Sequence, residues 1–171
     1  MAYTTFFIND RKKTLLNLIE TAGLSSSFGH YCYFSTPNNC VKACENIHVD
    51  IIFLVADKSP VMPLQTLRKK FPNATIVVVA TSVRTVNLLD VLHASGDGYM
   101  LQNTCPSEFL SIFQYFDQGG IWISPIMLNK LVQAVRGGEK KFRMEDYWPS
   151  AAHETTYTSI FSPIMFSTTA V

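Results

Sequence analysis

Polar side chains follow three apolar, strand-like segments of the chain, and these are the positions at which chemistry is expected. The clearest segment covers residues 51–55, which are uncharged and lie between Asp50 and the sequence that runs from Asp57 to Pro60. In open α/β sheets, ligands and reacting groups lie just beyond the carboxyl ends of parallel strands. Carboxylates, hydroxyl groups and amides at such ends are therefore the first candidates for binding or catalysis. They are Asn9 and Asp10 after the first segment, Asp57 after the second, and Thr81 and Ser82 after the third.

The elements that must position these side chains alternate between strand and helix. The strand candidates are short and rich in apolar, β-branched or aromatic residues. The segments between them repeat apolar residues at the spacing of a helix face. Such an alternation requires right-handed crossovers, so the pattern predicts an α/β fold with a parallel sheet and helices on both faces. The expected strands are residues 4–8, 31–34, 51–55, 74–80 and 99–101, and the expected helices are residues 11–22, 36–47, 62–70, 85–94, 106–116 and 126–135.

Composition and charge place the chain among cytoplasmic globular proteins. Its 171 residues are 47% hydrophobic and carry a net charge of +1, which suits one domain with a sizeable core. Lysines and arginines form no cluster, so direct nucleic-acid binding is not expected. The N-terminus lacks the features of a secretory signal, and no apolar run approaches the roughly 18 residues of a membrane helix. We therefore expect a cytoplasmic protein without membrane association, whose cysteines are reduced.

No metal centre and no enzyme motif are expected. Cys40 and Cys44 lie four residues apart on a predicted helix, but a metal would need two more ligands. His30 and His48 are the conceivable ones, and we interpret the cysteines instead as small, half-buried side chains. The sequence also lacks a nucleophile elbow and a phosphate-binding Gly-Lys-Ser/Thr loop, so it does not predict an enzyme.

The chain divides into three parts. Residues 1–124 hold the strand and helix alternations, and residues 125–137 form an extra helix with Pro125 in its first turn. Residues 138–171 begin with a charged stretch, become rich in serine and threonine, and show no sustained period. We expect this last part to be a poorly structured tail, or to dock through its apolar clusters at residues 160–161 and 164–166.

Two segments in the second half of the chain carry a family resemblance. Residues 93–102, HASGDGYMLQ, look like the segment AGADGYLLK, and residues 119–125, GGIWISP, look like the entry GG-x-W-x-S-P to a linker helix. Through these motifs, residues 3–136 resemble the receiver domain of NarL/LuxR-type response regulators of bacterial two-component systems. The resemblance implies a CheY-like, flavodoxin-like doubly wound sheet of five parallel strands in the order 2-1-3-4-5, followed by the extra C-terminal helix.

The chemistry of that family is phosphoryl transfer to an aspartate at the end of the third strand. Two acidic residues after the first strand hold Mg²⁺, a hydroxyl group follows the fourth strand, and a lysine follows the fifth. In this sequence the acceptor position falls on Val55 or Ala56, depending on the end from which it is counted, so the pocket is expected to be vestigial. Its positions are Asn9 and Asp10 for the acid pair, Val55, Ala56 and Asp57 at the acceptor strand, Ala80 with Thr81 beside it, and Gln102 in place of the lysine.

The pocket could still accept a phosphoryl group if the third strand contained a β-bulge. The sequence between Asp50 and Pro60 is one residue longer than in the family, which could bring Asp57 toward the pocket. Thr81 would then supply the hydroxyl group, and Asp10 would be a weak candidate ligand for Mg²⁺. The protein would be a phosphorelay receiver phosphorylated at Asp57. Against this, each strand residue adds about 3.3 Å, whereas in-line attack tolerates an error of about 1 Å.

The resemblance implies an atypical receiver, or pseudo-receiver, that acts in two-component-type signal transduction or transcription regulation through protein contacts. No cofactor is expected, and Mg²⁺ enters only if Asp57 is phosphorylated. The partner would be another protein or a second copy of the chain, because the sequence after Arg136 is too short for a helix-turn-helix DNA-binding domain. In the family, the fourth helix, fifth strand and fifth helix contact partners, although aromatic residues there can equally be core. The candidate face consists of Asn87, Asp90, Tyr99, Phe109, Phe113 and Tyr115.

Ligand sensing is a third possibility, either at the vestigial pocket or on the linker helix. Some biofilm regulators that the chain resembles bind cyclic di-GMP through a Trp-x-x-Arg motif where that helix begins. Here Trp122 is present, but Pro125 stands where the arginine would pair with phosphate. The linker helix is therefore not expected to bind this nucleotide.

Overall fold

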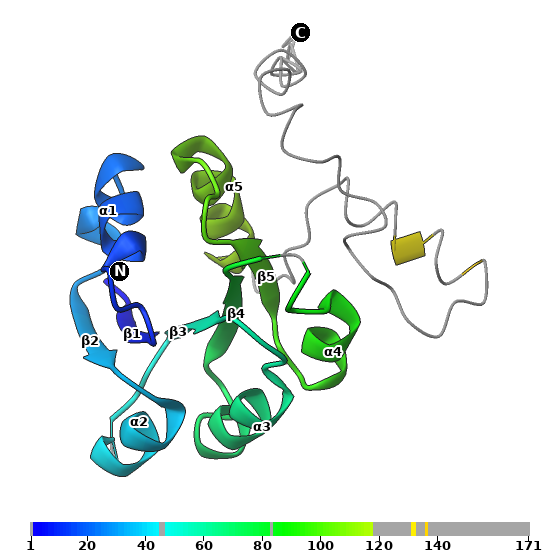
Figure 1. Cartoon of the computed structure of the whole chain (residues 1–171). Helices are drawn as coiled ribbons and strands as arrows, with labels where there is room; N and C mark the ends of the chain where they lie inside the picture. Colours follow the sequence, from blue (N-terminus) through cyan, green and yellow to red (C-terminus); the bar gives the residue numbers. More distant parts are fainter. Residues whose placement is uncertain (1, 45–46, 83, 118–130, 133–135, 137–171) are drawn as a thin grey trace, which may run out of the picture.

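The computed structural model describes residues 2–44, 47–82, 84–117, 131–132 and 136 of the chain. Within them, five parallel strands form one sheet in the order β2-β1-β3-β4-β5 (Figure 1), which confirms the predicted doubly wound α/β fold. The strands are β1 (Thr4–Ile8), β2 (His30–Phe34), β3 (Ile51–Ala56), β4 (Thr75–Ala80) and β5 (Gly98–Leu101). The helices are α1 (Thr14–Thr21), α2 (Pro37–Ala43), α3 (Val61–Lys70), α4 (Leu88–His93) and α5 (Pro106–Asp117), with a short 3₁₀ helix at Ser25–Ser27.

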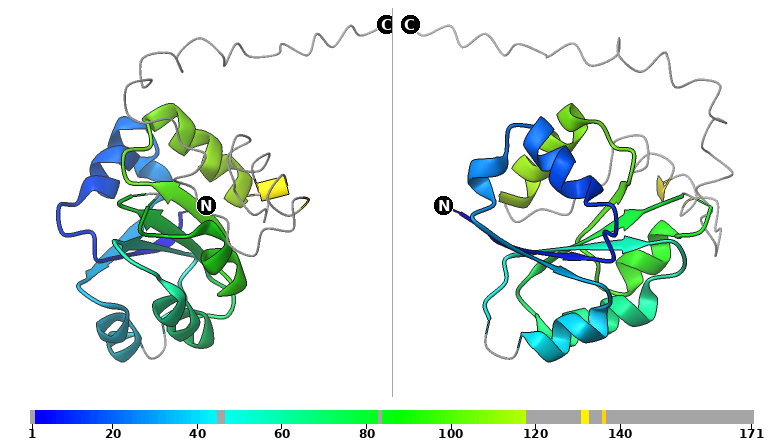
Figure 2. Two further views of the ribbon diagram at one scale, coloured as in Figure 1. Left: turned by 45° about the vertical axis from the view of Figure 1, so that its right-hand side comes forward. Right: turned by 60° about the vertical axis from the view of Figure 1, so that its left-hand side comes forward.

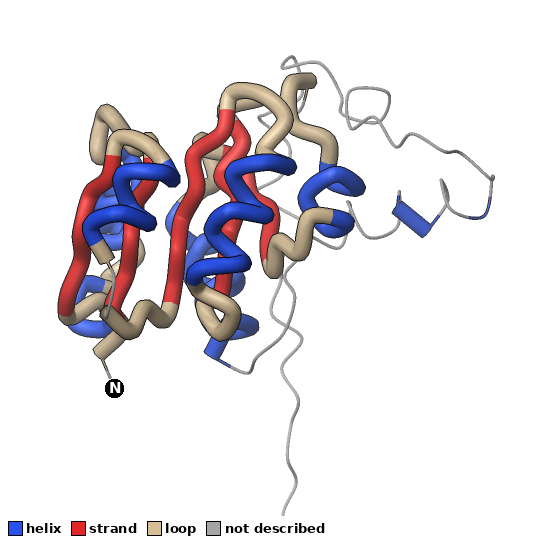
Figure 3. Tube along the Cα trace, turned by 90° about the horizontal axis from the view of Figure 1, so that it is seen from below, coloured by secondary structure: helices blue, strands red, loops and turns tan. Residues whose placement is uncertain are grey.

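The helices cover both faces of the sheet. α1 and α5 lie on one face, and α2, α3 and α4 lie on the other (Figures 1 and 2). Figure 3 shows the strands enclosed between these two helical layers. Along β3, Leu54 and Ala56 belong to the core shared with α2, α3 and α4, whereas Phe53 and Val55 belong to the core shared with α1 and α5. This burial on both faces explains why β3 is an uninterrupted apolar run.

The start of α1 differs from the sequence-based prediction. The helix begins at Thr14 rather than at residue 11. The Asp10 carboxylate accepts hydrogen bonds from the first two helix amides, and Lys13 adopts a left-handed backbone conformation with φ 53°. Residues 10–13 therefore form a turn that precedes α1, and they are not part of the helix.

Two other predicted boundaries are wrong. α4 begins at Leu88 rather than at residue 85, because the Asn87 side chain caps it and accepts a 3.0 Å hydrogen bond from the Leu89 amide. α2 ends at Ala43, so Ile47 lies outside the helix and is 49% exposed. The predicted helix at residues 126–135 and the tail at residues 138–171 lie outside the described residues, apart from residues 131 and 132. In the part of the chain that is described, no helix combines the length and apolar character needed to span a membrane.

Arg68 on α3 ties the end of that helix to the loop before β4 and to the loop before β5. Its guanidinium donates to the carbonyl oxygens of Pro72, Ala74 and Ser95 at 2.7–3.2 Å, and it pairs with the Asp97 carboxylate. The same Asp97 oxygen also accepts a 2.7 Å bond from the Ile76 amide. Arg68 thereby satisfies backbone carbonyls of two loops at the edge opposite the strand ends discussed below.

We predict that Arg68→Met lowers the free energy of unfolding by about 2–3 kcal/mol, because several charge-assisted hydrogen bonds are lost and Asp97 keeps only its backbone partner. Urea denaturation followed by circular dichroism measures the change. Arg84→Met is the matched control, because it removes the same charge from an exposed side chain. Equal unfolding midpoints for the two variants would contradict this role of Arg68.

Candidate functional site

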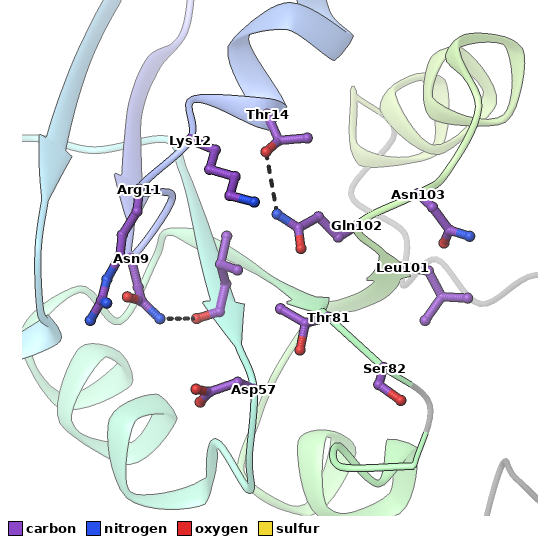
Figure 4. Close-up of a pocket in the computed structure, with 11 residues that line it drawn as sticks. Asn9, Arg11, Lys12, Thr14, Asp57, Thr81, Ser82, Leu101, Gln102 and Asn103 are labelled. Atoms are coloured by element: carbon purple, nitrogen blue, oxygen red, sulfur yellow. Dashed lines mark hydrogen bonds between the residues drawn. The ribbon is translucent and has the colours of Figure 1, made fainter.

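The carboxyl ends of β1, β3, β4 and β5 meet at one edge of the sheet and border an open cavity of about 800 Å³ (Figure 4). The register pairs Val55 with Val79 and Ala56 with Ala80, so the ends of β3 and β4 are level. The sequence analysis predicted that polar residues would gather here, and the structure places several of them together. The cavity is lined by Asn9, Arg11, Lys12, Thr14, Val55, Asp57, Thr81, Ser82, Leu101, Gln102 and Asn103.

At the end of β3 the cavity wall is apolar. Val55 lines the cavity, whereas Ala56 points to the opposite face and packs into the core beneath α2, α3 and α4. Because side chains alternate along a strand, only one of the two predicted acceptor positions can face this edge, and it is Val55. The backbone oxygen of Val55 accepts a 3.1 Å hydrogen bond from Asn9 Nδ2. The position therefore offers no nucleophile, and its carbonyl group is already paired.

Asp57 does reach the cavity. It follows Val55 by two residues, is exposed, and lines the lower edge of the space in Figure 4. An active acceptor requires Asp57 to reach the pocket, and the structure places it there. Of the described lining residues, Asp57 alone carries a carboxylate.

The Asp10 side chain caps helix α1 and does not line the cavity. Its carboxylate is buried, with Oδ1 accepting from the Thr14 amide at 3.0 Å and Oδ2 accepting from the Leu15 amide at 3.1 Å. Asp10 is absent from the residues that line the cavity. A carboxylate at the positive end of a helix, bonded to two amides there, is a helix-capping group. The weak candidacy of Asp10 as a Mg²⁺ ligand is therefore not supported by its geometry.

Asn9, Thr81 and Gln102 hold the strand ends together. Asn9 has a left-handed backbone with φ 63°, a conformation that asparagine tolerates better than most residues. Thr81 donates to the Ala56 carbonyl through its amide at 3.0 Å and its hydroxyl group at 3.3 Å. Gln102 Nε2 donates to Thr14 Oγ1 at 3.3 Å, which joins the end of β5 to the start of α1. Ala80, the first hydroxyl position considered, is wholly buried in the core.

Sequence reasoning missed the two cations of the cavity. Arg11 and Lys12 follow Asn9 and Asp10 directly in the loop after β1, and both line the cavity. Lys12 extends toward Gln102 in Figure 4, whereas the next lysine, Lys13, lies over the Tyr33 ring at 5.5 Å from its centroid. The signal in the sequence was the position of Lys12 immediately after a strand end, but a pair of adjacent lysines is typical of solvated surface.

The cavity does not fit Mg²⁺. That ion binds through one or two carboxylates in a near-octahedral set of oxygen ligands. Here one carboxylate, that of Asp57, shares the space with the positively charged side chains of Arg11 and Lys12. The other acid of the region, Asp10, is directed into the α1 backbone.

The cysteines and histidines do not form a metal-binding group in the described part of the chain. Cys40 and Cys44 are buried, and burial raises the pKa of the Cys40 thiol to about 12. Cys32 and Cys105 are exposed, which corrects the expectation that the cysteines are half-buried. A thiol whose pKa is raised by burial stays protonated near neutral pH, so Cys40 is an inert core residue.

The predicted partner face is wrong at two of its aromatic residues, Tyr99 and Phe109. Tyr99 and Phe109 are wholly buried, and the Tyr99 hydroxyl group donates to the Val86 carbonyl at 3.3 Å, inside the core. Burial raises the pKa of Tyr99. Phe113 packs against Phe28 with ring centroids 5.1 Å apart. Tyr99 and Phe109 are therefore core and cannot contact a partner in this conformation, whereas Phe113 packs against the core and is only partly buried.

The remaining members of that face have different positions. Asn87 is engaged as the cap of α4, and Asp90 is half-buried on the same helix. Tyr115 lies on α5, but its side chain is outside the described part of the structure. Asn87 and Asp90 stay as predicted contact residues.

Comparison with known proteins identifies the fold. No protein-family profile matches the sequence, and no curated protein matches it. Among solved structures, a LuxR-family two-component response regulator from an Aurantimonas species has a TM-score of 0.65 at 10% identity, over 80% of this chain and 99% of that chain. A LuxR-family DNA-binding response regulator from Silicibacter pomeroyi has a TM-score of 0.55 at 17% identity, over 72% of this chain and 98% of that one.

A third structure is a receiver domain by itself. The non-phosphorylated receiver domain of the stress response regulator RcsB from Escherichia coli has a TM-score of 0.58 at 11% identity, and the match covers 71% of this chain and 97% of that domain. Together with the strand order, these matches show that the chain has the CheY-like receiver fold. Sequence identities of 10–17% with these structures establish a shared fold alone.

We predict that Asp10→Ala lowers the free energy of unfolding by about 1–2 kcal/mol, because two amides at the start of α1 lose their acceptors. Asp57→Ala removes the same charge from an exposed position and is expected to change stability by less than about 0.5 kcal/mol. Chemical denaturation of both variants beside the native chain measures the difference. A larger loss in Asp57→Ala than in Asp10→Ala would contradict the assignment of Asp10 as a structural cap.

Proposed function

We propose that this chain is an atypical receiver module of two-component-type signalling, one that acts through protein contacts without carrying a phosphoryl group on an aspartate. The observation that supports this most strongly is Val55, which occupies the cavity wall at the end of β3, where the acceptor carboxylate would stand. The cavity is otherwise built as a receiver pocket is, from the ends of the same strands. What differs is the set of side chains.

Phosphoryl transfer to Asp57 would lack its usual support. Asp57 lies two residues beyond Val55, a displacement on the order of 6 Å along an extended chain, whereas in-line attack tolerates about 1 Å. Such a transfer relies on a divalent cation held by carboxylates, and Asp57 is the one carboxylate among the described lining residues. Gln102 stands where the lysine would be, and its amide group is hydrogen-bonded to Thr14. We therefore assign no catalytic residue, no cofactor and no enzymatic activity to the chain.

The hydrogen bonds at the strand ends support a single conformation of the signalling surface. Thr81 bonds to Ala56, Gln102 bonds to Thr14, and Tyr99 is held inside the core by Val86. A receiver that does not switch can still present a fixed surface to another protein or to a second copy of itself. We propose such a contact surface over α4 and its neighbours, with Asn87 and Asp90 on it, in a cytoplasmic protein that regulates transcription through its partner.

A second candidate is an irregular receiver that is phosphorylated at Asp57 with Mg²⁺. The observation in its favour is the place of Asp57 in the cavity, within the same space as Thr81. The two candidates differ in whether a phosphoryl group becomes covalently attached to Asp57, so a measurement of that modification distinguishes them.

Incubation with acetyl phosphate and Mg²⁺, followed by intact mass spectrometry, tests the proposal. We expect the mass of the native chain to be unchanged, because Val55 cannot accept a phosphoryl group and Asp57 lies beyond the acceptor position without a second carboxylate to hold Mg²⁺. Asp57→Asn is run in parallel as the variant that cannot be phosphorylated at this residue. A conventional receiver domain in the same reaction shows that the phosphodonor is active.

A phosphate-sized mass increase on the native chain that is absent from Asp57→Asn would overturn the proposal in favour of the second candidate. Sedimentation velocity of the same samples adds an independent readout. The proposed module has the same distribution of oligomers with and without acetyl phosphate, since no modification alters its surface.

A further inference from the structure

Strand β2 is an open edge of the sheet. In the described part of the chain it pairs with β1 alone, and it lies at the outer margin of the fold with α1 on one face and α2 on the other (Figure 1). Its sequence, HYCYF, contains no lysine, arginine, acidic residue or proline. Charged residues and prolines are common means by which an edge strand avoids pairing with another strand, and β2 has neither.

The backbone groups of two tyrosines are directed toward this open edge. At the ends of the strand, the His30 amide donates a 3.4 Å hydrogen bond to the β1 side, and the Phe34 carbonyl accepts one of 2.8 Å from it. Successive residues of a strand direct their backbone groups to alternate edges, so every second residue of β2 bonds to β1. Tyr31 and Tyr33 therefore offer two N–H and two C=O groups outward, as a template for another strand.

We infer that two copies of this chain associate by antiparallel pairing of their β2 strands, which joins the two sheets into one. With the two-fold axis at Cys32, Tyr31 of each copy lies opposite Tyr33 of the other, and both pairs exchange their N–H and C=O groups in four hydrogen bonds. The pairing uses every outward backbone group of both strands. Cys32 then lies opposite Cys32 of the second copy, in a pair without backbone hydrogen bonds.

The side chains on the α1 face of β2 suit a second copy. Phe7 stacks on Tyr33 with ring centroids 5.1 Å apart, and Tyr31 lies 5.9 Å from Tyr33. Tyr31 is nevertheless 47% exposed. Antiparallel pairing brings Tyr33 of the second copy beside it, and aromatic cross-strand pairs stabilise a sheet. The row of rings that runs from β1 to β2 thus continues into the same row of the other copy.

The charges of α1 are complementary in this arrangement. Lys13 lies over the Tyr33 ring, and Glu20 follows seven residues later, which is two turns along the same side of the helix. Glu20 acts on the same ring, since burial and the charges of Asp10, Tyr31 and Glu20 raise the pKa of Tyr33 to about 12. The two-fold axis sets the α1 helices of the two copies antiparallel on one face. The Lys13 end of each helix therefore lies toward the Glu20 end of the other.

This association does not depend on the proposed function. β2 and β5 are opposite edges of the sheet, so pairing through β2 leaves the surface over α4 exposed. A dimer of this kind presents that surface twice, once on each copy.

Sedimentation velocity of the full chain, kept reduced and measured over a range of concentrations, tests the association. Edge pairing of five residues per copy buries less area than a standard interface, so we expect a dissociation constant of roughly 10–100 μM. Cys32→Lys places two like charges opposite each other at the axis and is expected to weaken the dimer at least about tenfold. Cys105→Lys is the matched control, because it adds the same charge at the other exposed cysteine, and it should keep the dissociation constant within about twofold. Circular dichroism shows that both variants keep the fold.

Disulfide cross-linking tests the register separately. Cα atoms of such a cross-strand pair are about 4.5 Å apart, within the range that a disulfide spans. Copper phenanthroline with dissolved oxygen oxidises the two Cys32 thiols to a disulfide, and oxygen takes up their electrons and protons. We expect covalent dimers of the native chain and of Cys105→Ser on a non-reducing gel, and their loss in Cys32→Ser.

A native chain that is monomeric at every concentration would overturn the inference, and would show that β2 is covered within one chain or left for another protein. Equal weakening by Cys32→Lys and Cys105→Lys, or equal cross-linking in Cys32→Ser and Cys105→Ser, would also overturn it, because the copies would then associate through another surface. None of these results involves acetyl phosphate, so self-association and the lack of phosphorylation can fail separately.

Discussion

The pairing of β3 between β1 and β4 is the constraint on which the rest of the site depends. The register places Leu54 beside Ile8 and Val55 beside Val79, and it buries every side chain of β3 on one face or the other. A strand held on both sides cannot rotate or slip by one residue without exchanging its two faces. Val55 therefore faces the cavity and Ala56 does not. The side chain that faces the cavity at the acceptor position is thus fixed by the packing of the core, and it is the apolar Val55.

Around that fixed strand, the charged groups have roles unlike those of a phosphoryl-transfer site. Asp10 is bonded to α1, Gln102 joins β5 to α1, and Lys12 brings the positive charge into the cavity from the opposite side. The result is a receiver fold whose strand-end cavity is lined, among the described residues, by two cationic side chains and one carboxylate.

The sheet, its strand order and most element positions could be predicted because they follow from apolar periodicity and from the resemblance to receivers. The side-chain directions could not. Whether Val55 or Ala56 faces the cavity depends on the register of β3, and whether Lys12 or Lys13 enters it depends on the left-handed turn at Lys13. Tyr99 and Phe109 were assigned to a surface because their sequence positions fit one, yet both are core. The first residues of α1 and α4 differ from the predicted ones because the side chains of Asp10 and Asn87 accept hydrogen bonds from amides of these helices.

We propose that this edge of the sheet does not bind a divalent cation. Mn²⁺ tests it most directly, since it binds where Mg²⁺ binds and broadens the amide resonances of residues around it. Small additions of Mn²⁺ to the ¹⁵N-labelled chain should leave the amides of Asn9, Asp57 and Gln102 as sharp as those at the far end of the sheet. Selective broadening at these three residues would show a metal site at the strand ends and would contradict the account.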